Sequence, residues 1–294
     1  MPMETLRTGF GLLEGPVWDP KLGLLFADAQ LGGVHRLDLH GNVTTIVEHR
    51  RGIGGVVRHQ AGGVIVSGRN IGYKGPLAPG TVVLLEKDPP NGVIGFNDIT
   101  TDRAGRIYAG ALGFLPTETE LSGIGAEGKA APLFLIDLDG SHRIVHPAIK
   151  LSNGMGFSPD GRLLYHADSG DRTVYVYDVK GDGSLSNRRS FASVRSGLPD
   201  GLAIDTDGSI WLAVAHAGQV VVFAADGSII RQFDFPLPMT TSLCFGGEDM
   251  RDLYVVTGSD GTGRTDAGSI FRLRSDVPGL SISPARVAIS SASQ

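Results

Sequence analysis

The stretch LSNGMGFSPDGRLLYHADSGDRTVYVYDV, residues 151–179, decides the fold. It holds one apolar segment before Asp160-Gly161, a second at 161–168 and a third at 173–179. Short segments rich in Val, Leu and aromatic residues, bounded by Gly and Asp, are typical of strands joined by tight hairpins. The stretch therefore predicts three consecutive antiparallel strands.

The same unit recurs six times along the chain. Its second strand appears as GLLFAD, GGVIVSG, GRIYAG, GRLLYHAD, GSIWLAV and RDLYVVTG. Third strands follow as GVHRLDL, TVVLLE, LFLIDL, TVYVYDV, QVVVFA and SIFRLR. The first strands begin about 40 to 56 residues apart, which matches a four-stranded propeller blade, near Val17, Val57, Ile99, Met155, Leu202 and Leu243. We therefore predict an all-β, six-bladed β-propeller with four-stranded blades, forming a single domain over residues 1–294.

Composition agrees with this fold and excludes several classes of protein. The chain has 43 glycines in 294 residues, about twice the usual share, and six blades need many hairpins. A net charge of −5 argues against nucleic acid as a partner. Neither a signal peptide nor a membrane-spanning run is visible, and the single cysteine, Cys244, excludes an internal disulfide. We expect a cytoplasmic protein without a membrane partner, and the sequence assigns no oligomeric state.

Two segments are longer than a hairpin requires. They are residues 68–80 in the second blade and 113–131 in the third. Long loops in a compact domain are either functional lids or disordered segments, and both readings stay open. The sixth blade also lacks an outer strand in this count. Either METLRT (3–8) or PARVAI (284–289) could supply it.

Polar residues stand at the same phase near the start of several first strands. Because first strands of propeller blades line the central channel, these side chains should meet at one rim. Oxygen atoms from carboxylates and carboxamides are the ligands that Ca²⁺, Mg²⁺ and Mn²⁺ prefer. The pattern predicts a divalent metal site built from Glu14, Asn97, Asn153 and Asp200, with Gly54-Gly55 and Thr240-Thr241 at the same phase in the other two blades.

An ordinary turn is the competing interpretation for two of these positions. Asn153-Gly154 and Asp200-Gly201 are also common hairpin dipeptides. In both blades, however, the hairpin after the first strand already has its own pair, Asp160-Gly161 or Asp207-Gly208. The earlier pairs enter the inner strand, which favours the metal site.

Five segments, taken in order, resemble the blade signatures of the gluconolactonase/regucalcin (senescence marker protein) family. They are LLEGPVWD, FNDITTDRAGRIYAG, LSNGMGFSPDGRLLYHAD, LPDGLAIDTDGSIWLAV and TTSLCFGGEDMRDLYVVTG. The resemblance runs from about residue 9 to 275. It implies a six-bladed propeller with one divalent cation, most often Ca²⁺ (with Mg²⁺, Mn²⁺ or Zn²⁺ as alternatives), and a small-molecule lactone or ester as substrate.

The resemblance also implies roles for individual residues. Glu14, Asn153 and Asp200 match metal ligands, Asn97 matches a position that touches metal or substrate, and Asp200 matches the catalytic base. Beside Asn97, we consider three further side chains as substrate-binding candidates, with core or surface roles as the alternatives: Phe96, Tyr73 and His216.

One departure from the family pattern concerns the substrate. Sugar lactonases of this family often read Arg-Phe-Asn-Asp-Gly in the third blade, where this chain has Gly95 and Ile99 at the first and last positions. Loss of a guanidinium removes a bidentate donor for hydroxyl groups. We therefore expect a metal-dependent lactonase, or related carboxylic ester hydrolase, for a lactone less polar than an aldonolactone. The alternatives are a phosphotriesterase or fluorophosphatase on the same site and a non-catalytic calcium-binding propeller.

Overall fold

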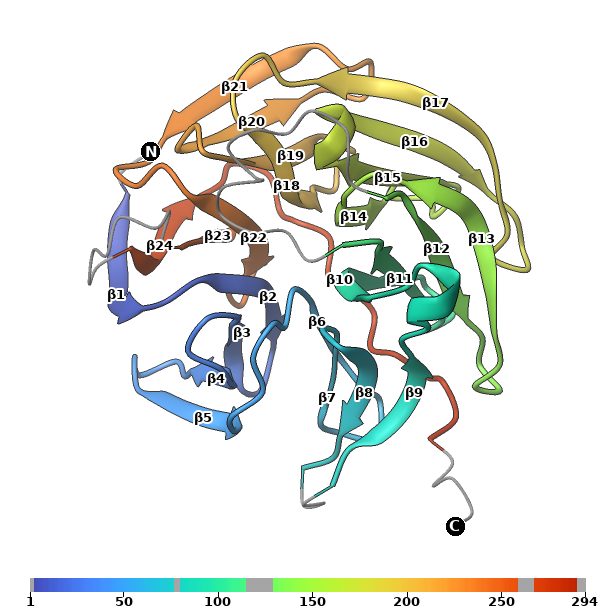
Figure 1. Cartoon of the computed structure of the whole chain (residues 1–294). Helices are drawn as coiled ribbons and strands as arrows, with labels where there is room; N and C mark the ends of the chain where they lie inside the picture. Colours follow the sequence, from blue (N-terminus) through green and yellow to red (C-terminus); the bar gives the residue numbers. More distant parts are fainter. Residues whose placement is uncertain (1–2, 77–79, 115–128, 259–266, 290–294) are drawn as a thin grey trace.

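Short apolar strands and tight turns build six four-stranded antiparallel sheets, which follow one another around a central axis (Figure 1). The computed structural model describes residues 3–76, 80–114, 129–258 and 267–289. In five of the six sheets the strands run in sequence order from the axis outward, and in the sixth β22, β23 and β24 are followed by β1 as the outermost strand. The predicted six-bladed β-propeller is confirmed.

The strands of the six blades follow from the inside outward. Blades 1 and 2 contain β2 (Leu13–Asp19), β3 (Gly23–Asp28), β4 (Val34–Leu37), β5 (Val43–Val47) and β6 (Val56–Arg58), β7 (Val64–Val66), β8 (Asn70–Lys74), β9 (Val82–Glu86). Blades 3 and 4 contain β10 (Gly95–Thr101), β11 (Ile107–Leu112), β12 (Ala131–Ile136), β13 (His142–Ile149) and β14 (Ser152–Phe157), β15 (Leu163–Asp168), β16 (Thr173–Val179), β17 (Leu185–Ser193). Blades 5 and 6 contain β18 (Leu198–Ile204), β19 (Ile210–Ala215), β20 (Gln219–Phe223), β21 (Ile229–Asp234) and β22 (Thr240–Gly246), β23 (Asp252–Thr257), β24 (Gly268–Arg274), β1 (Glu4–Phe10). The described residues add two short 3₁₀ helices, η1 (Pro89–Asn91) and η2 (Ser169–Asp171), and none of their helices is long and apolar enough to cross a membrane.

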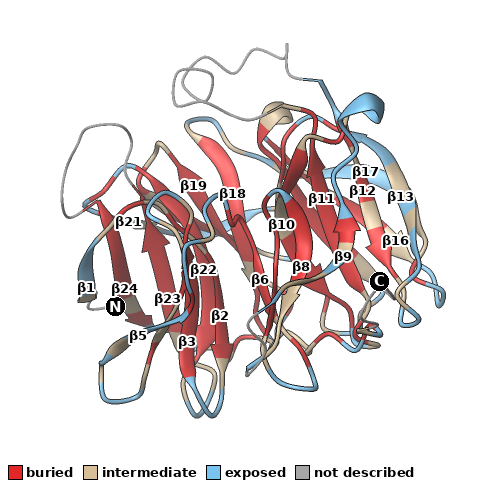
Figure 2. Cartoon of the chain, turned by 60° about the horizontal axis from the view of Figure 1, so that its bottom comes forward, coloured by how far each residue is buried: buried red, intermediate tan, exposed pale blue. Residues whose placement is uncertain are grey.

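The hydrophobic core lies between blades and not within any one of them. Strands β3, β11 and β19 are buried at every residue because both faces of each sheet pack against a neighbouring blade. Among the described residues, one apolar cluster fills each of the six junctions between blades. Figure 2 shows buried residues along the inner strands of the blades and exposed residues at the outer strands and loops. Each blade is therefore stable only beside its neighbours.

The N-terminal segment closes the ring. Strand β1 pairs antiparallel with β24 and becomes the outer strand of blade 6, with Glu4 opposite Arg272. The Arg272 guanidinium donates to the Glu4 carboxylate at 2.6 Å. Of the two alternatives, the METLRT segment therefore supplies the missing strand.

The PARVAI segment has a different place. It belongs to a C-terminal strap, residues 275–289, which crosses the end of the ring at which the inner strands finish. The strap is held by backbone hydrogen bonds to four blades: Gly279 N–H to Met250 O, Leu280 N–H to Ile204 O, Ala285 N–H to Arg58 O and Ala288 N–H to Leu138 O, at 2.7 to 2.8 Å. The strap therefore covers this far end of the central channel.

Blade 2 differs from the sequence-based expectation. The segment at 81–86 was expected as the third strand and 68–80 as an insertion, but β8 lies inside 68–80 and is the third strand, while β9 is the fourth. Strand β8 reads NIGYK, which has a glycine at its centre and polar ends, so it lacks the apolar pattern of the other third strands. Of the two expected insertions, residues 77–79 and 115–128 lie outside the described residues.

Candidate functional site

The mouth of the channel is the end of the ring at which the inner strands begin. Near this end the pairing register of five inner strands shifts, which marks β-bulges: the shifts fall between Glu14 and Val17, Phe96 and Ile99, Ser152 and Met155, Pro199 and Leu202, and Thr240 and Ser242. A bulge frees residues from the ladder and re-aims their side chains. The predicted site residues lie within or at the edge of these bulges.

Two glycines explain how neighbouring inner strands come so close together. Gly154 and Gly201 lie inside β14 and β18 and do not have positive φ angles. A Cβ on Gly154 would stand 2.4 Å from the Leu202 nitrogen, and a Cβ on Gly201 would stand 2.7 Å from the Ser242 Cα. The Asn-Gly and Asp-Gly pairs are therefore not hairpin turns. Each glycine gives the next blade room beside the preceding polar side chain.

A methyl group at Gly154 is expected to disrupt this approach. The Gly154→Ala variant should lose about 2 to 4 kcal/mol of unfolding free energy, because its Cβ would overlap backbone atoms of β18 that cannot move aside. Denaturant unfolding followed by tryptophan fluorescence measures this loss. Gly181→Ala is the matched control, since its Cβ would have no neighbour within 4 Å, and equal stability of the two variants would contradict the close-approach argument.

Three carboxylates face one another at the mouth. Burial, followed by the charges of Asp200 and Asp98, raises the pKa of Glu14 well above its usual value. Burial and the Asp98 charge likewise raise the pKa of Asp200, and burial raises the pKa of Asp98 to about 7. The Asp200 Oδ1 atom is buried and has no hydrogen-bond partner among the described residues. The cluster is therefore arranged to receive a positive charge or protons.

The two carboxamides of the mouth bind each other. The Asn97 Nδ2 group donates to the Ser152 carbonyl oxygen at 2.9 Å and to Asn153 Oδ1 at 3.1 Å. Asn153 Nδ2 donates to Ser169 Oγ at 3.0 Å, and Ser169 Oγ donates to the Pro199 carbonyl oxygen at 2.6 Å. This chain of hydrogen bonds links blades 3, 4 and 5 and fixes the orientation of the Asn153 carboxamide.

Blades 2 and 6 have neither a carboxylate nor a carboxamide at this phase. In blade 2, Gly54 and Gly55 leave room for two side chains of blade 3. A Cβ on Gly54 would stand 2.3 Å from Asn97 Oδ1, and a Cβ on Gly55 would stand 2.8 Å from Asp98 Oδ1. In blade 6, the Thr241 hydroxyl donates to the Leu13 carbonyl oxygen at 2.6 Å. These residues shape the ring and do not contribute charge.

The substrate-binding candidates separate into two groups. His216 follows β19 at the mouth, where it is half-buried with a φ of 62°, and Asn97 lies in the carboxamide network. Phe96 is only 1% exposed and packs in the cluster between blades 2 and 3. The Tyr73 hydroxyl donates to the Gly62 carbonyl oxygen in a far-end hairpin. The structure does not bring Phe96 and Tyr73 to the mouth, because one side chain faces the interblade core and the other lies along a strand that runs away from it.

Asp98 is the site residue that sequence reasoning missed. It follows Asn97 directly, and assigning one inward residue per strand leaves it on the wrong face. The bulge between Phe96 and Ile99 removes that alternation. The Asp98 carboxylate accepts a 2.7 Å hydrogen bond from the Ile99 N–H. The signal in the sequence that could have revealed Asp98 is the Asn97-Asp98 step, in which two successive polar residues stand near the start of an inner strand.

A serine and a histidine that bond each other lie beneath the mouth. Ser152 Oγ and His166 Nε2 are 2.8 Å apart, and both residues are at most 1% exposed. Burial lowers the pKa of His166 to about 3, with further lowering by the charges of His146 and Arg188. A pair without access to substrate does not act as nucleophile and base. It fixes the start of β14, from which Asn153 projects.

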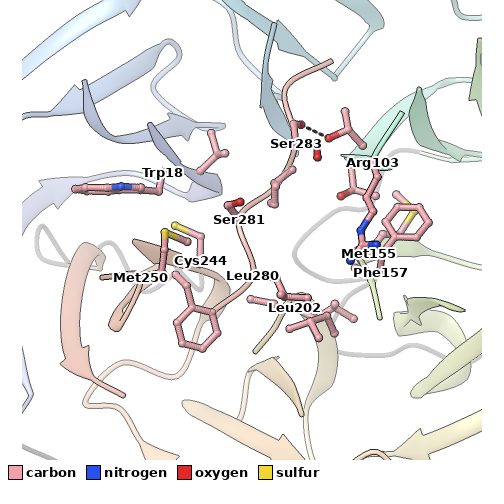
Figure 3. Close-up of a pocket in the computed structure, with 18 of the residues that line it drawn as sticks. Trp18, Arg103, Met155, Phe157, Leu202, Cys244, Met250, Leu280, Ser281 and Ser283 are labelled. Carbon is pink, nitrogen blue, oxygen red and sulfur yellow. Dashed lines mark hydrogen bonds between the residues drawn. The ribbon is translucent and has the colours of Figure 1, made fainter. Parts of the chain in front are cut away.

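A separate cavity of about 270 Å³ occupies the far end (Figure 3). Trp18, Met155, Leu202 and Cys244 line it, and residues 280–283 of the C-terminal strap pass across it. Burial raises the pKa of the Cys244 thiol, and no titratable cluster faces the cavity among its lining residues. The buried carboxylates Glu14, Asp98 and Asp200 lie at the opposite end of the channel, at the mouth.

The mouth contains oxygen donors suited to a hard cation, although they are not all of one kind. Within the described ranges, no three His, Cys, Asp or Glu side chains form a metal site by themselves. The donors at the mouth combine Glu14 and Asp200 with the neutral Asn153 carboxamide, a mixture that Ca²⁺ accepts because it also takes amide and water oxygens. The unpartnered Asp200 Oδ1 fits such an ion, as do the pKa values of Glu14 and Asp200, which burial and neighbouring carboxylates raise.

Comparison with known proteins gives consistent similarities. The family model described as SMP-30/Gluconolactonase/LRE-like region matches residues 12–259. A pentonolactonase, XacC, of Haloferax volcanii is 34% identical over 286 residues, which cover 92% of this chain and 93% of that protein. A 6-deoxy-6-sulfogluconolactonase of Pseudomonas putida is 30% identical over 278 residues, covering 90% and 92%. The structure of regucalcin, a calcium-binding protein of Agrobacterium tumefaciens, superposes with a TM-score of 0.82 at 20% identity and covers 97% of each chain.

Proposed function

Because the chain belongs to the SMP-30/gluconolactonase/LRE-like family, we propose that it is a lactonase that hydrolyses a small-molecule lactone at the mouth of its channel. Two of its relatives carry lactonase names and match nine-tenths or more of this chain. The observation that carries the proposal is the cluster of Glu14, Asp98 and Asp200, in which burial raises all three pKa values and neighbouring carboxylates raise those of Glu14 and Asp200 further, beside an unpartnered Asp200 oxygen. A cluster of this kind in a structural role would be neutralised by bonds within the protein.

The proposal includes one divalent cation. Glu14, Asn153 and Asp200 would hold it, with calcium favoured by the hard, mixed oxygen donors. When bound, such a cation polarises a carbonyl group and lowers the pKa of water. Asn97 would orient Asn153 through the 3.1 Å hydrogen bond between their carboxamides.

Asp200 has the second role of general base. One carboxylate oxygen of Asp200 would hold the cation, and the other would take the proton of the water whose oxygen bonds to the lactone carbonyl carbon. The ring C–O bond then breaks, and the departing alkoxide takes a proton back to give the hydroxy acid. Asp98, whose pKa is raised by burial, would lie beside Asp200, and His216 would lie at the edge of the substrate site.

The expected preference for a less polar lactone has lost part of its support. It depended on the guanidinium that is lost at Gly95, and the apolar Phe96 beside Gly95 adds nothing to it, because the Phe96 side chain faces the interblade core. We therefore propose a lactone as the substrate class without an apolar restriction.

A substrate panel tests the proposal. We expect the protein with added CaCl₂ to open five- and six-membered lactones, measured as acid release in a pH-stat, and to leave paraoxon intact. Hydrolysis of paraoxon without lactone turnover would instead assign a phosphotriesterase to the same site. Calcium binding in calorimetry without turnover of either class would assign a non-catalytic calcium-binding propeller.

A further inference from the structure

A basic wall borders the mouth on the side of blade 2. Arg50 and Arg51 precede the inner strand β6, and Arg69 follows β7. Their segments lie against each other, because a Cβ on Gly68 would stand 2.7 Å from the Gly52 carbonyl oxygen. Arg51 and Arg69 are exposed, whereas Arg50 is half-buried.

The backbone places Arg69 directly beside inner strand β10. Gly68 and Phe96 exchange backbone hydrogen bonds of 2.7 and 3.1 Å. A Cβ on Gly95 would stand 3.9 Å from the Arg69 Cα. Gly95 is two residues from Asn97 along β10, about 7 Å at the usual rise of a strand. Because Gly95 has no side chain, nothing on β10 at that position separates Arg69 from the mouth.

Arg50 forms a fixed base for this wall. Its Nη2 donates to the Ser67 carbonyl oxygen at 2.9 Å and to the Asn70 carbonyl and side-chain oxygens at 2.7 and 2.9 Å. Burial lowers the pKa of Arg50, and the charge of Arg69 lowers it further, so the two guanidinium groups lie close enough to repel. Glu86 acts on Arg50 in the opposite direction and also accepts a hydrogen bond from Asn70.

The positive charges of Arg51 and Arg69 are not paired with carboxylates of the described residues. In the part of the chain that the structure describes, neither Arg51 nor Arg69 makes a hydrogen bond or ion pair through its side chain. On the blade 4 side of the same mouth, Lys150 pairs with Asp171 at 2.5 Å, and Arg188 lies 3.8 Å from two aspartates. Two adjacent unpaired guanidinium groups beside a polar site are typical of anion recognition.

We propose that Arg69, assisted by Arg51, binds an anionic group of the substrate. The substrate class would be a lactone that carries a phosphate, sulfonate or carboxylate on the side of the ring away from its carbonyl. A net charge of −5 and three carboxylates at the mouth would otherwise repel such a molecule. This inference rests on the proposed lactonase function and names its substrate class.

Kinetics with matched lactones tests the inference. The probes are δ-gluconolactone, its 6-phosphate and glucaro-1,4-lactone, which are neutral, phosphorylated and carboxylated. We expect kcat/KM to be at least about tenfold higher for an anionic probe than for the neutral one. Arg69→Gln should lower the anionic value by about 10-fold to 100-fold, mostly through KM, and change the neutral value by less than about threefold. The anionic probe that shows the larger loss identifies the group.

Arg162→Gln is the matched control. It removes the same charge from an exposed arginine in the far-end hairpin between β14 and β15, and it should leave both values unchanged. An Arg69→Gln variant that loses activity equally on neutral and anionic lactones would overturn the inference, as would a wild-type protein without preference.

A binding experiment separates failure of this inference from failure of the lactonase proposal. If the wild-type protein opens none of the lactones, the open-chain acids gluconate and 6-phosphogluconate are titrated in a calorimeter. Tighter binding of 6-phosphogluconate that Arg69→Gln abolishes would support the anion subsite on its own. Equal binding of both acids would refute it.

Discussion

The Asp200→Asn variant is expected to lose about a thousandfold or more in kcat/KM for its best lactone. The substitution preserves the shape of the side chain, but it removes a negative charge from the proposed cation site and the basic oxygen that accepts a proton. A thousandfold loss corresponds to about 4 kcal/mol of transition-state stabilisation. The pH-stat assay measures it under saturating calcium.

Asp207→Asn is the control for this variant. Asp207 is an exposed aspartate in the far-end hairpin of the same blade, and its replacement should change kcat/KM by less than about twofold. Activity of the wild-type protein should fall at low pH, where the general base is protonated, and this acid limb should be absent from the residual activity of Asp200→Asn. A loss smaller than tenfold would show that Asp200 neither holds the cation nor acts as the base.

The metal-free protein should become less stable as the pH rises from about 4 through 7. The folded-state pKa of Asp98 is raised from 3.8 to about 7, and those of Glu14 and Asp200 are also raised. In this window the folded protein retains protons that the unfolded chain has released, so raising the pH removes stability. The cost should reach on the order of a few kcal/mol by pH 8, visible as a decrease of several degrees in Tm in the presence of chelator.

Calcium should reverse this trend, because a cation that binds only the folded protein stabilises it, most strongly when the carboxylates are ionised. Asp98→Asn removes one of the repelling charges and should therefore raise the Tm of the metal-free protein more at pH 8 than at pH 5. A Tm that does not change between pH 5 and 8 in chelator, combined with no response to calcium, would mean that the three carboxylates do not interact.

Much of the fold could be predicted because each blade repeats the same local pattern of apolar strands and turn residues. All six inner strands contain the positions expected from the spacing of Val17, Val57 and their counterparts. The third strand of blade 2 escaped prediction because its five residues carry a central glycine and no apolar run. Its identity comes from pairing with β7 and β9, which is a long-range property.

The proposed site follows from the sequence where one residue per blade contributes to it, and does not follow where the backbone departs from regular alternation. The phase of the inner strands is enough to propose Glu14, Asn153 and Asp200. Asp98 was not found, because a β-bulge turns two successive residues of β10 out of the ladder. Phe96 was predicted as a substrate-binding candidate, and its side chain packs between blades 2 and 3, because regular alternation does not say which neighbouring blade covers each face of a strand.

The pairing of the first strand with the last has a consequence for how the molecule is made. Glu4 and Arg272 are 268 positions apart in the chain, so the contact that closes the ring has a very large sequence separation and raises the contact order of the fold. During translation, β1 has no strand to pair with until β24 has been synthesised, and the C-terminal strap is synthesised after β24. Early blades therefore face solvent on apolar surfaces for most of translation, which makes the incomplete chain prone to aggregation and a natural client for chaperones.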